Sequence, residues 1–164
     1  MKLKFGSQQY RVEFAFFLFT SDFDLHYTWF RSTSLYEEFY DNYHSIIEDC
    51  TCEFCANYVL ACDKFPSAWI DLFESLGIDP RKEGEVSHYI KNEDGTNFYG
   101  AFYHIVGNII EGPLIEKGNE SSLSFIKYNG LEIGFNEDLS LVPTAFPKPI
   151  IQFEVQLNVP WILS

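Results

Sequence analysis

EVSHYIKNEDGTNFYGAFYHIVGNII, which spans residues 85–110, is the stretch of sequence that decides the fold. Residues 85–90 and 97–110 are rich in β-branched and aromatic side chains, a composition typical of strands. Between them stands the pair Asp94-Gly95, which tolerates the positive φ angles of a tight turn. The stretch therefore predicts two antiparallel strands joined as a hairpin.

A second hairpin is predicted farther along the chain, where Asn129-Gly130 separates residues 123–128 from residues 131–135. Asn-Gly is the strongest short-range signal for a two-residue turn between antiparallel strands. Residues 150–157 are predicted to form the last strand, because they are rich in the apolar and β-branched side chains that strands favour.

Residues 10–19, near the N-terminus, are also predicted to form a strand, because apolar side chains occupy every second position. The second half of this segment is apolar on both faces, which indicates a strand within a sheet that is covered on each side. Together with the two hairpins and the last strand, it predicts an antiparallel sheet of five or six strands.

Between these strands the periodicity becomes helical. Ser34 and Glu37 have the spacing of a capping box, which predicts that a helix begins there. Apolar residues then recur every three or four positions as far as Ile46 or Ile47, and most acidic residues fall on the other sides. We therefore expect an amphipathic helix with one strongly negative face.

Two further helices are predicted over residues 53–62 and 67–76. Pro66 suits the first turn of the second of them, and Gly77 suits the position just after its last turn. The apolar residues on the buried side of that helix are Trp69, Leu72, Phe73 and Leu76.

Length and composition fit one folded domain: the chain has 164 residues, of which 46% are hydrophobic and 18% aromatic. The predicted fold is therefore a single α+β domain over residues 1–164. It consists of an antiparallel sheet of five or six strands with the helical segment 34–76 packed on one face. No segment has the basic flank, apolar run and small-residue cleavage site of a signal peptide, so we expect a cytoplasmic protein that does not enter membranes.

The charge indicates the kind of partner. The chain carries 24 acidic and 11 basic residues, a formal net charge of −13. Nucleic acid is excluded as a direct ligand, because its phosphates must be neutralised by basic side chains. Seven acidic residues lie between Ser32 and Asp63, a window without any Lys or Arg. Because such a field attracts cations and steers in cationic partners, we expect a basic protein partner.

Tyrosines and acidic residues alternate within this window, a mixture that protein interfaces favour. Aromatic side chains would supply buried contact area there, and the charges would set the association rate. The residues predicted to bind the partner are Tyr36, Glu37, Glu38, Tyr40, Asp41, Glu48 and Asp49.

Four cysteines lie within thirteen positions, and with His44 they are the candidate metal ligands: Cys50, Cys52, Cys55 and Cys62. If the segment from Cys55 to Cys62 is helical, these two thiols lie about two turns apart, roughly 10 Å, which is too far to share one ion. We therefore expect Cys55 and Cys62 to be small buried apolar side chains, with no metal and no cofactor. A metal-binding structural or regulatory protein is the alternative function.

The common signatures of phosphate binding, dinucleotide binding, zinc proteases and serine hydrolases are absent from the sequence. His104 lies on a predicted strand, and a histidine that acts as a base needs a nucleophile or carboxylate within hydrogen-bond reach. The sequence places neither beside it, so we expect a core histidine, no catalytic residue and no enzyme. A small enzyme with a pocket on the sheet near His104 is a further alternative.

The combination of small size, acidic charge, many aromatic residues and α+β architecture resembles the immunity proteins of bacterial contact-dependent or polymorphic toxin systems. The resemblance rests on these overall features and on no motif, so it transfers no functional residues. It implies a cytoplasmic, stoichiometric inhibitor that covers the active site of a basic toxin, often a nuclease, through an acidic patch. We therefore predict an acidic inhibitor of a basic toxin domain.

Overall fold

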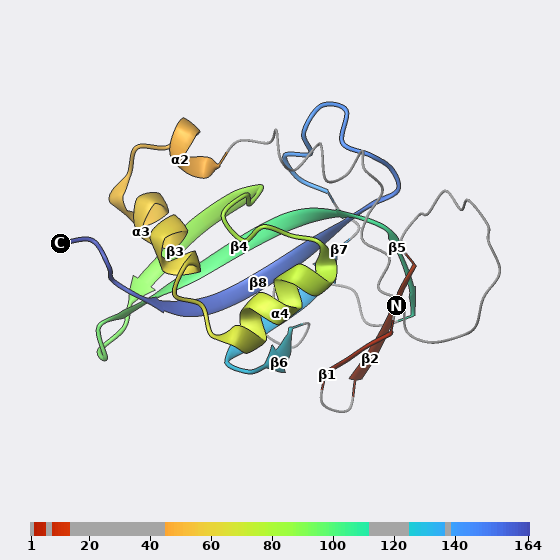
Figure 1. Cartoon of the computed structure of the whole chain (residues 1–164), viewed down its shortest axis with the longest axis horizontal. Helices are drawn as coiled ribbons and strands as arrows, with labels where there is room; N and C mark the ends of the chain where they lie inside the picture. The colour runs from red at the N-terminus through yellow and green to blue at the C-terminus, as the bar shows by residue number, and fades with distance from the viewer. Residues whose placement is uncertain (1, 6–7, 14–44, 112–124, 137–138) are drawn as a thin grey trace.

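The computed structural model describes residues 2–5, 8–13, 45–111, 125–136 and 139–164, and these form two antiparallel sheets and three helices (Figure 1). The larger sheet has five strands, so the predicted α+β class and the predicted antiparallel sheet are confirmed. No helix in the described ranges is long and apolar enough to cross a membrane.

The five-stranded sheet has the order β3-β4-β8-β7-β6. Its strands are β3 (Glu85–Lys91), β4 (Thr96–Val106), β6 (Ile126–Tyr128), β7 (Leu131–Asn136) and β8 (Ile150–Pro160). Both predicted hairpins are present, since β3 pairs with β4 and β6 pairs with β7. Strand β8 lies between β4 and β7 and joins the two hairpins into one sheet.

Strands β4 and β8 are paired along their whole lengths, from Thr96 opposite Pro160 to Val106 opposite Ile150. Strand β8 is longer than the predicted 150–157, because β4 offers hydrogen-bonding partners as far as Thr96. The two longest strands of the described chain thus form the centre of the sheet, with β3 on one side of them and β7 and β6 on the other.

The strand predicted over residues 97–110 is broken at Gly107, whose N–H donates to the Pro149 carbonyl at 2.9 Å. The residues after this break form β5 (Asn108–Glu111), which leaves the large sheet. Strand β5 pairs with β2 (Gln8–Glu13), and β2 pairs with β1 (Lys2–Phe5), in a separate three-stranded sheet. The N-terminal strand, expected in the main sheet, therefore belongs to this smaller one; the second half of its predicted span, residues 14–19, lies outside the described residues.

A short helix, α2 (Ile46–Asp49), begins immediately after Ser45. Ser45 has extended backbone angles, so no helix passes through it, and the predicted helix from Ser34 to Ile46 or Ile47 is wrong at this point. The reason is a second match to the same capping pattern: the Ser45 N–H donates to Glu48 Oε1 at 3.0 Å. The helix start predicted at Ser34 lies outside the described residues.

Helices α3 (Glu53–Cys62) and α4 (Ser67–Leu76) have the predicted bounds. Helix α4 ends where Gly77 adopts a φ of 70°, a left-handed conformation that favours glycine. The N–H of Ile78 then donates to the carbonyl of Phe73 at 2.9 Å, which closes the last turn. Local sequence signals therefore sufficed to predict the bounds of both helices.

Both helices cover the same face of the large sheet (Figure 1). Tyr58 of α3 contacts Tyr99, and Phe73 of α4 contacts Tyr103, with ring centroids 5.5 and 5.2 Å apart. Tyr99 and Tyr103 are four residues apart on β4, so strand alternation puts them on one face. This confirms that the helices pack on one side.

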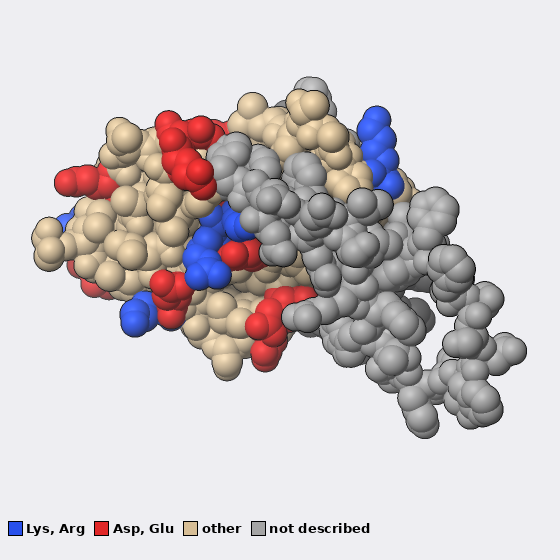
Figure 2. Space-filling view, turned by 45° about the horizontal axis from the view of Figure 1, so that its top comes forward, with Lys and Arg blue, Asp and Glu red and all other residues tan. Residues whose placement is uncertain are grey.

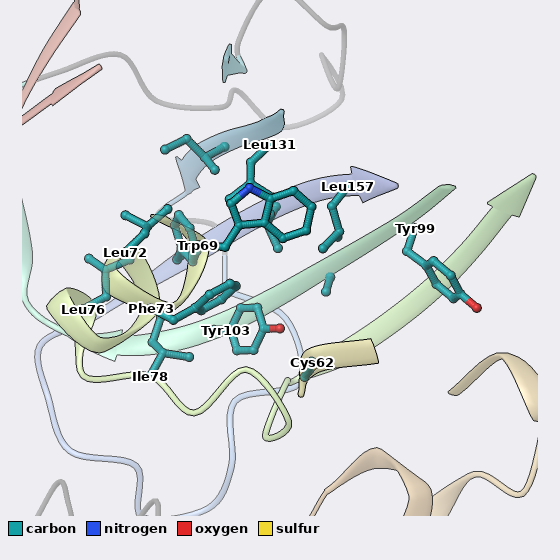
Figure 3. Close-up of a cluster of buried hydrophobic side chains, with 14 of the residues drawn as sticks. Cys62, Trp69, Leu72, Phe73, Leu76, Ile78, Tyr99, Tyr103, Leu131 and Leu157 are labelled. Carbon is teal, nitrogen blue, oxygen red and sulfur yellow. The ribbon is translucent and has the colours of Figure 1, made fainter. Parts of the chain in front are cut away.

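The buried core lies between these helices and the sheet (Figure 3). The four residues predicted for the inner side of α4 are all buried. Trp69 also donates from Nε1 to the Asn129 carbonyl at 2.8 Å, which ties α4 to the turn between β6 and β7. The helical layer is thus fixed to both predicted hairpins.

Candidate functional site

Three cysteine side chains meet at the short connection between α2 and α3. Cys50 is the residue that ends α2, Cys52 is the N-cap of α3, and Cys55 lies in the first turn of α3. Their three Sγ atoms all lie within 4.8 Å of one another. Cys52 is exposed, Cys50 is half-buried and Cys55 is buried, so the cluster opens to the surface on one side.

Helix geometry explains why Cys52 and Cys55 converge. The side chain of an N-cap residue turns toward the amide three positions later, where it accepts a hydrogen bond. Here Cys52 Sγ accepts from the Cys55 N–H at 3.4 Å. Cys50 joins them from the end of α2, which lies in contact with α3; the backbone is extended at both Cys50 and Cys52.

The two thiols at the start of α3 differ in acidity. The hydrogen bond from the Cys55 amide lowers the pKa of the Cys52 thiol. Burial raises the pKa of the Cys55 thiol, with a further contribution from its contact with Cys52. Cys52 is therefore the thiol of this pair that ionises first.

Cys62 does not belong to the cluster. It is buried in the core, and its Sγ donates to the carbonyls of Tyr58 at 3.3 Å and Pro80 at 3.4 Å. The expectation that Cys62 is a small buried side chain therefore agrees with its position. Cys55 is also buried, as expected, and its sulfur in addition lies close to those of Cys50 and Cys52. His44 lies outside the described residues.

The start of α3 is fixed to the sheet by contacts on both sides of the cysteine cluster. The ring of Phe54 stacks on His88 of β3 with centroids 4.0 Å apart, and its carbonyl accepts from Tyr99 Oη at 3.2 Å. Asn57 is fully buried and binds the C-terminal segment, donating to the Pro160 carbonyl at 3.1 Å and accepting from the Ile162 N–H at 2.6 Å.

Acidic side chains dominate the surface of the helical layer. Between Ser45 and Leu76 there are six acidic residues, all exposed, and a single basic residue, Lys64. The acidic residues are Glu48, Asp49, Glu53, Asp63, Asp71 and Glu74. Figure 2 shows one face of the molecule, on which acidic groups are spread around uncharged areas with basic groups between them.

Large apolar side chains are exposed within the same layer. Ile47 and Leu60 are each 44% exposed and Phe54 is 41% exposed. Of the residues predicted to bind a partner, Glu48 and Asp49 lie on α2 beside Ile47. The other five, Tyr36, Glu37, Glu38, Tyr40 and Asp41, lie outside the described residues.

His104 is a core histidine in this structure. It is 3% exposed, its Nε2 lies 2.8 Å from the Ser140 carbonyl, and its ring contacts Phe102 and Phe146. Burial lowers the pKa of His104, which favours the neutral ring. These contacts agree with the expected core position.

Glu83 is a buried carboxylic acid that the sequence analysis missed. Only 2% of it is exposed, and neither carboxylate oxygen has a hydrogen-bond partner among the described residues. Burial raises the pKa of Glu83 to about 8, although the nearby amides of Glu83 and Ile46 oppose the shift. Glu83 lies in the connection before β3, where no periodic pattern exists, so the sequence carried no signal of its burial.

Comparison with protein-family models, with curated proteins and with solved structures found no match to this chain.

Proposed function

We propose that this protein acts by stoichiometric binding to a basic protein partner, as an immunity-type inhibitor of a toxin domain. The observation that carries the proposal is the exposure of every acidic side chain in the described helical layer, against one lysine. A folded domain gains no stability from such repulsion, whereas a concentrated negative field accelerates encounter with a cationic surface.

The exposed apolar residues of the same layer support a binding surface. Charges mainly set the association rate and orientation, whereas buried apolar contacts slow dissociation. Ile47, Phe54 and Leu60 supply such contacts next to Glu48, Asp49 and Glu53. The surface therefore offers both components that a tight inhibitor needs.

The experiment compares two double charge reversals that change the net charge equally. Asp49→Lys with Glu53→Lys alters the helical layer, and Glu85→Lys with Glu93→Lys alters the exposed edge of the sheet. The partner is a basic toxin domain encoded beside this protein's gene, with nuclease domains tested first, and association and dissociation rates are measured at several salt concentrations.

The helical-layer variant is expected to associate about ten-fold more slowly at low salt and to lose much of its salt dependence. The sheet-edge variant is expected to stay closer to the wild type, because its charges lie on β3 and on the turn after it and not on the helices. Equal slowing in both variants would contradict recognition by the helical layer. Absence of any binding to the neighbouring toxin domain would contradict the immunity function itself.

A further inference from the structure

The cluster of Cys50, Cys52 and Cys55 is a candidate metal site. This site is independent of the proposed protein partner. Three thiol sulfurs within 4.8 Å of one another, drawn from six consecutive residues, exceed what packing alone requires. Buried cysteines that serve only as small apolar side chains are placed as Cys62 is, against backbone and aromatic rings. Here the sulfurs face each other.

The N-cap residue of α3, Cys52, also indicates that the sulfurs have a role beyond packing. Helix N-caps favour Ser, Thr, Asp and Asn, whose oxygen atoms accept the amide hydrogen bond well. Cys52 occupies this position and makes only the longer 3.4 Å contact to the Cys55 N–H. Cysteine is the weaker cap, so what it adds at this position is a sulfur atom directed at two other sulfurs.

We propose that Cys50, Cys52 and Cys55 form a binding site for a thiophilic divalent metal ion of the zinc class. Zinc–sulfur bonds of about 2.3 Å place the sulfurs of a tetrahedral site about 3.8 Å apart. The observed limit of 4.8 Å is close to this spacing, so small side-chain rotations would bring the three sulfurs to it. The three thiolates fill three of four positions, which leaves the fourth for water or an added ligand.

Charge and attachment both favour the site. Three thiolates need a cation to offset their repulsion, and the surrounding acidic surface concentrates cations near them. The contacts of Phe54 with His88 and of Asn57 with Pro160 fix the first turn of α3 before any ion binds. Binding exchanges protons for metal, so each thiol that becomes a ligand releases its proton.

Unlike a structural zinc centre, this site is not expected to be needed for folding. Cys50 and Cys52 are not part of the hydrophobic core between α3, α4 and the sheet. Cys55 is the one ligand that is buried. We therefore expect chelation to remove the ion without unfolding the chain. This separates the site from zinc fingers, which unfold when the metal is removed.

The test is a titration of the reduced full chain with Co²⁺, followed by displacement with Zn²⁺. Tetrahedral cobalt bound by thiolates has an intense sulfur-to-metal absorption band, so the ligands are read directly from the spectrum. We expect one equivalent of Co²⁺ to give this band, Zn²⁺ to abolish it, and protons to be released into a weakly buffered solution. Far-UV circular dichroism is expected to be the same with and without chelator.

Two variants decide the ligand set. Cys52→Ser removes an exposed sulfur and keeps a good N-cap, so it should fold and yet bind Co²⁺ at least about ten-fold more weakly. Cys62→Ala removes the cysteine outside the cluster and should bind Co²⁺ as the wild type does. The proposal is overturned by an absent sulfur-to-metal band, by unchanged binding to Cys52→Ser, or by one ion shared between two chains.

Discussion

Tyr58 of α3 and Tyr103 of β4 share a hydrogen bond between their hydroxyl groups, 2.7 Å long, inside the core. Both side chains are fully buried, and Tyr103 Oη donates to the Pro80 carbonyl at 2.9 Å. Each hydroxyl has one proton, so Tyr58 is the donor and Tyr103 the acceptor in their shared bond. The two residues form a directed chain from the helix through the sheet to the loop after α4.

This direction predicts unequal effects of removing the two hydroxyls. Tyr103→Phe leaves the buried Tyr58 hydroxyl without its acceptor and the Pro80 carbonyl with only the weaker Cys62 thiol donor, which should cost about 2–3 kcal/mol of unfolding free energy. Tyr58→Phe removes only a donor and should cost about 1 kcal/mol. Urea unfolding of both variants measures the difference, and a larger loss in Tyr58→Phe would contradict the assigned direction.

Glu83 should make stability fall as pH rises. Burial raises its pKa from 4.5 to about 8, so between these values the folded chain holds a proton that the unfolded chain has lost. The contribution is complete below pH 4.5 and disappears as pH rises through about 8, with a slope of up to about 1.4 kcal/mol per pH unit. Negative charge on Asp79 acts in the same direction.

Replacing Glu83 by Gln tests this dependence, because an amide of the same shape has no proton to lose. The unfolding free energy of Glu83→Gln should be less sensitive to pH between 5 and 8 than that of the wild type. The matched control is Glu85→Gln, which changes an exposed neighbour. Parallel pH profiles for wild type and Glu83→Gln would show that the carboxyl is not protonated in the folded state.

Asn57 should control the order of the C-terminal segment. Asn57→Ala removes the hydrogen bonds of a fully buried amide to the Pro160 carbonyl and the Ile162 N–H, which belong to exposed residues of the C-terminal segment. We expect a loss of about 2–4 kcal/mol, with faster amide exchange at Ile162 than elsewhere in the sheet. Uniform changes in exchange across all strands would instead indicate a purely global effect.

Cys52→Ser should stabilise the metal-free chain. A serine oxygen accepts the Cys55 N–H better than a thiol does, so the start of α3 should gain about 0.5 kcal/mol. Thermal unfolding in the presence of a chelator measures the gain, and Cys50→Ser, which occupies no N-cap, is the control. A lower melting temperature for Cys52→Ser would show that its sulfur contributes to folding without metal.

Short-range patterns predicted helices α3 and α4 and both hairpins of the large sheet. Pro66 and Gly77 bracket α4 because they act on the backbone angles of their own turn, and Asn129-Gly130 does the same for the second hairpin. The C-x-C-x-x-C spacing at Cys50 was also visible. With α3 predicted from residue 53, the N-cap position of Cys52 already implied that it would turn toward Cys55.

Only the tertiary structure decided which elements meet. The pairing of β4 with β8 joins residues up to 64 positions apart, from Thr96 to Pro160, and the departure of β5 at Gly107 depends on the Pro149 carbonyl. The hydrogen bonds of the Cys62 thiol to the Tyr58 and Pro80 carbonyls depend on the core around Tyr58, and the burial of Glu83 depends on packing around its loop. Side-chain periodicity reports the local path of the backbone, whereas burial and convergence depend on contacts between segments that sequence spacing does not encode.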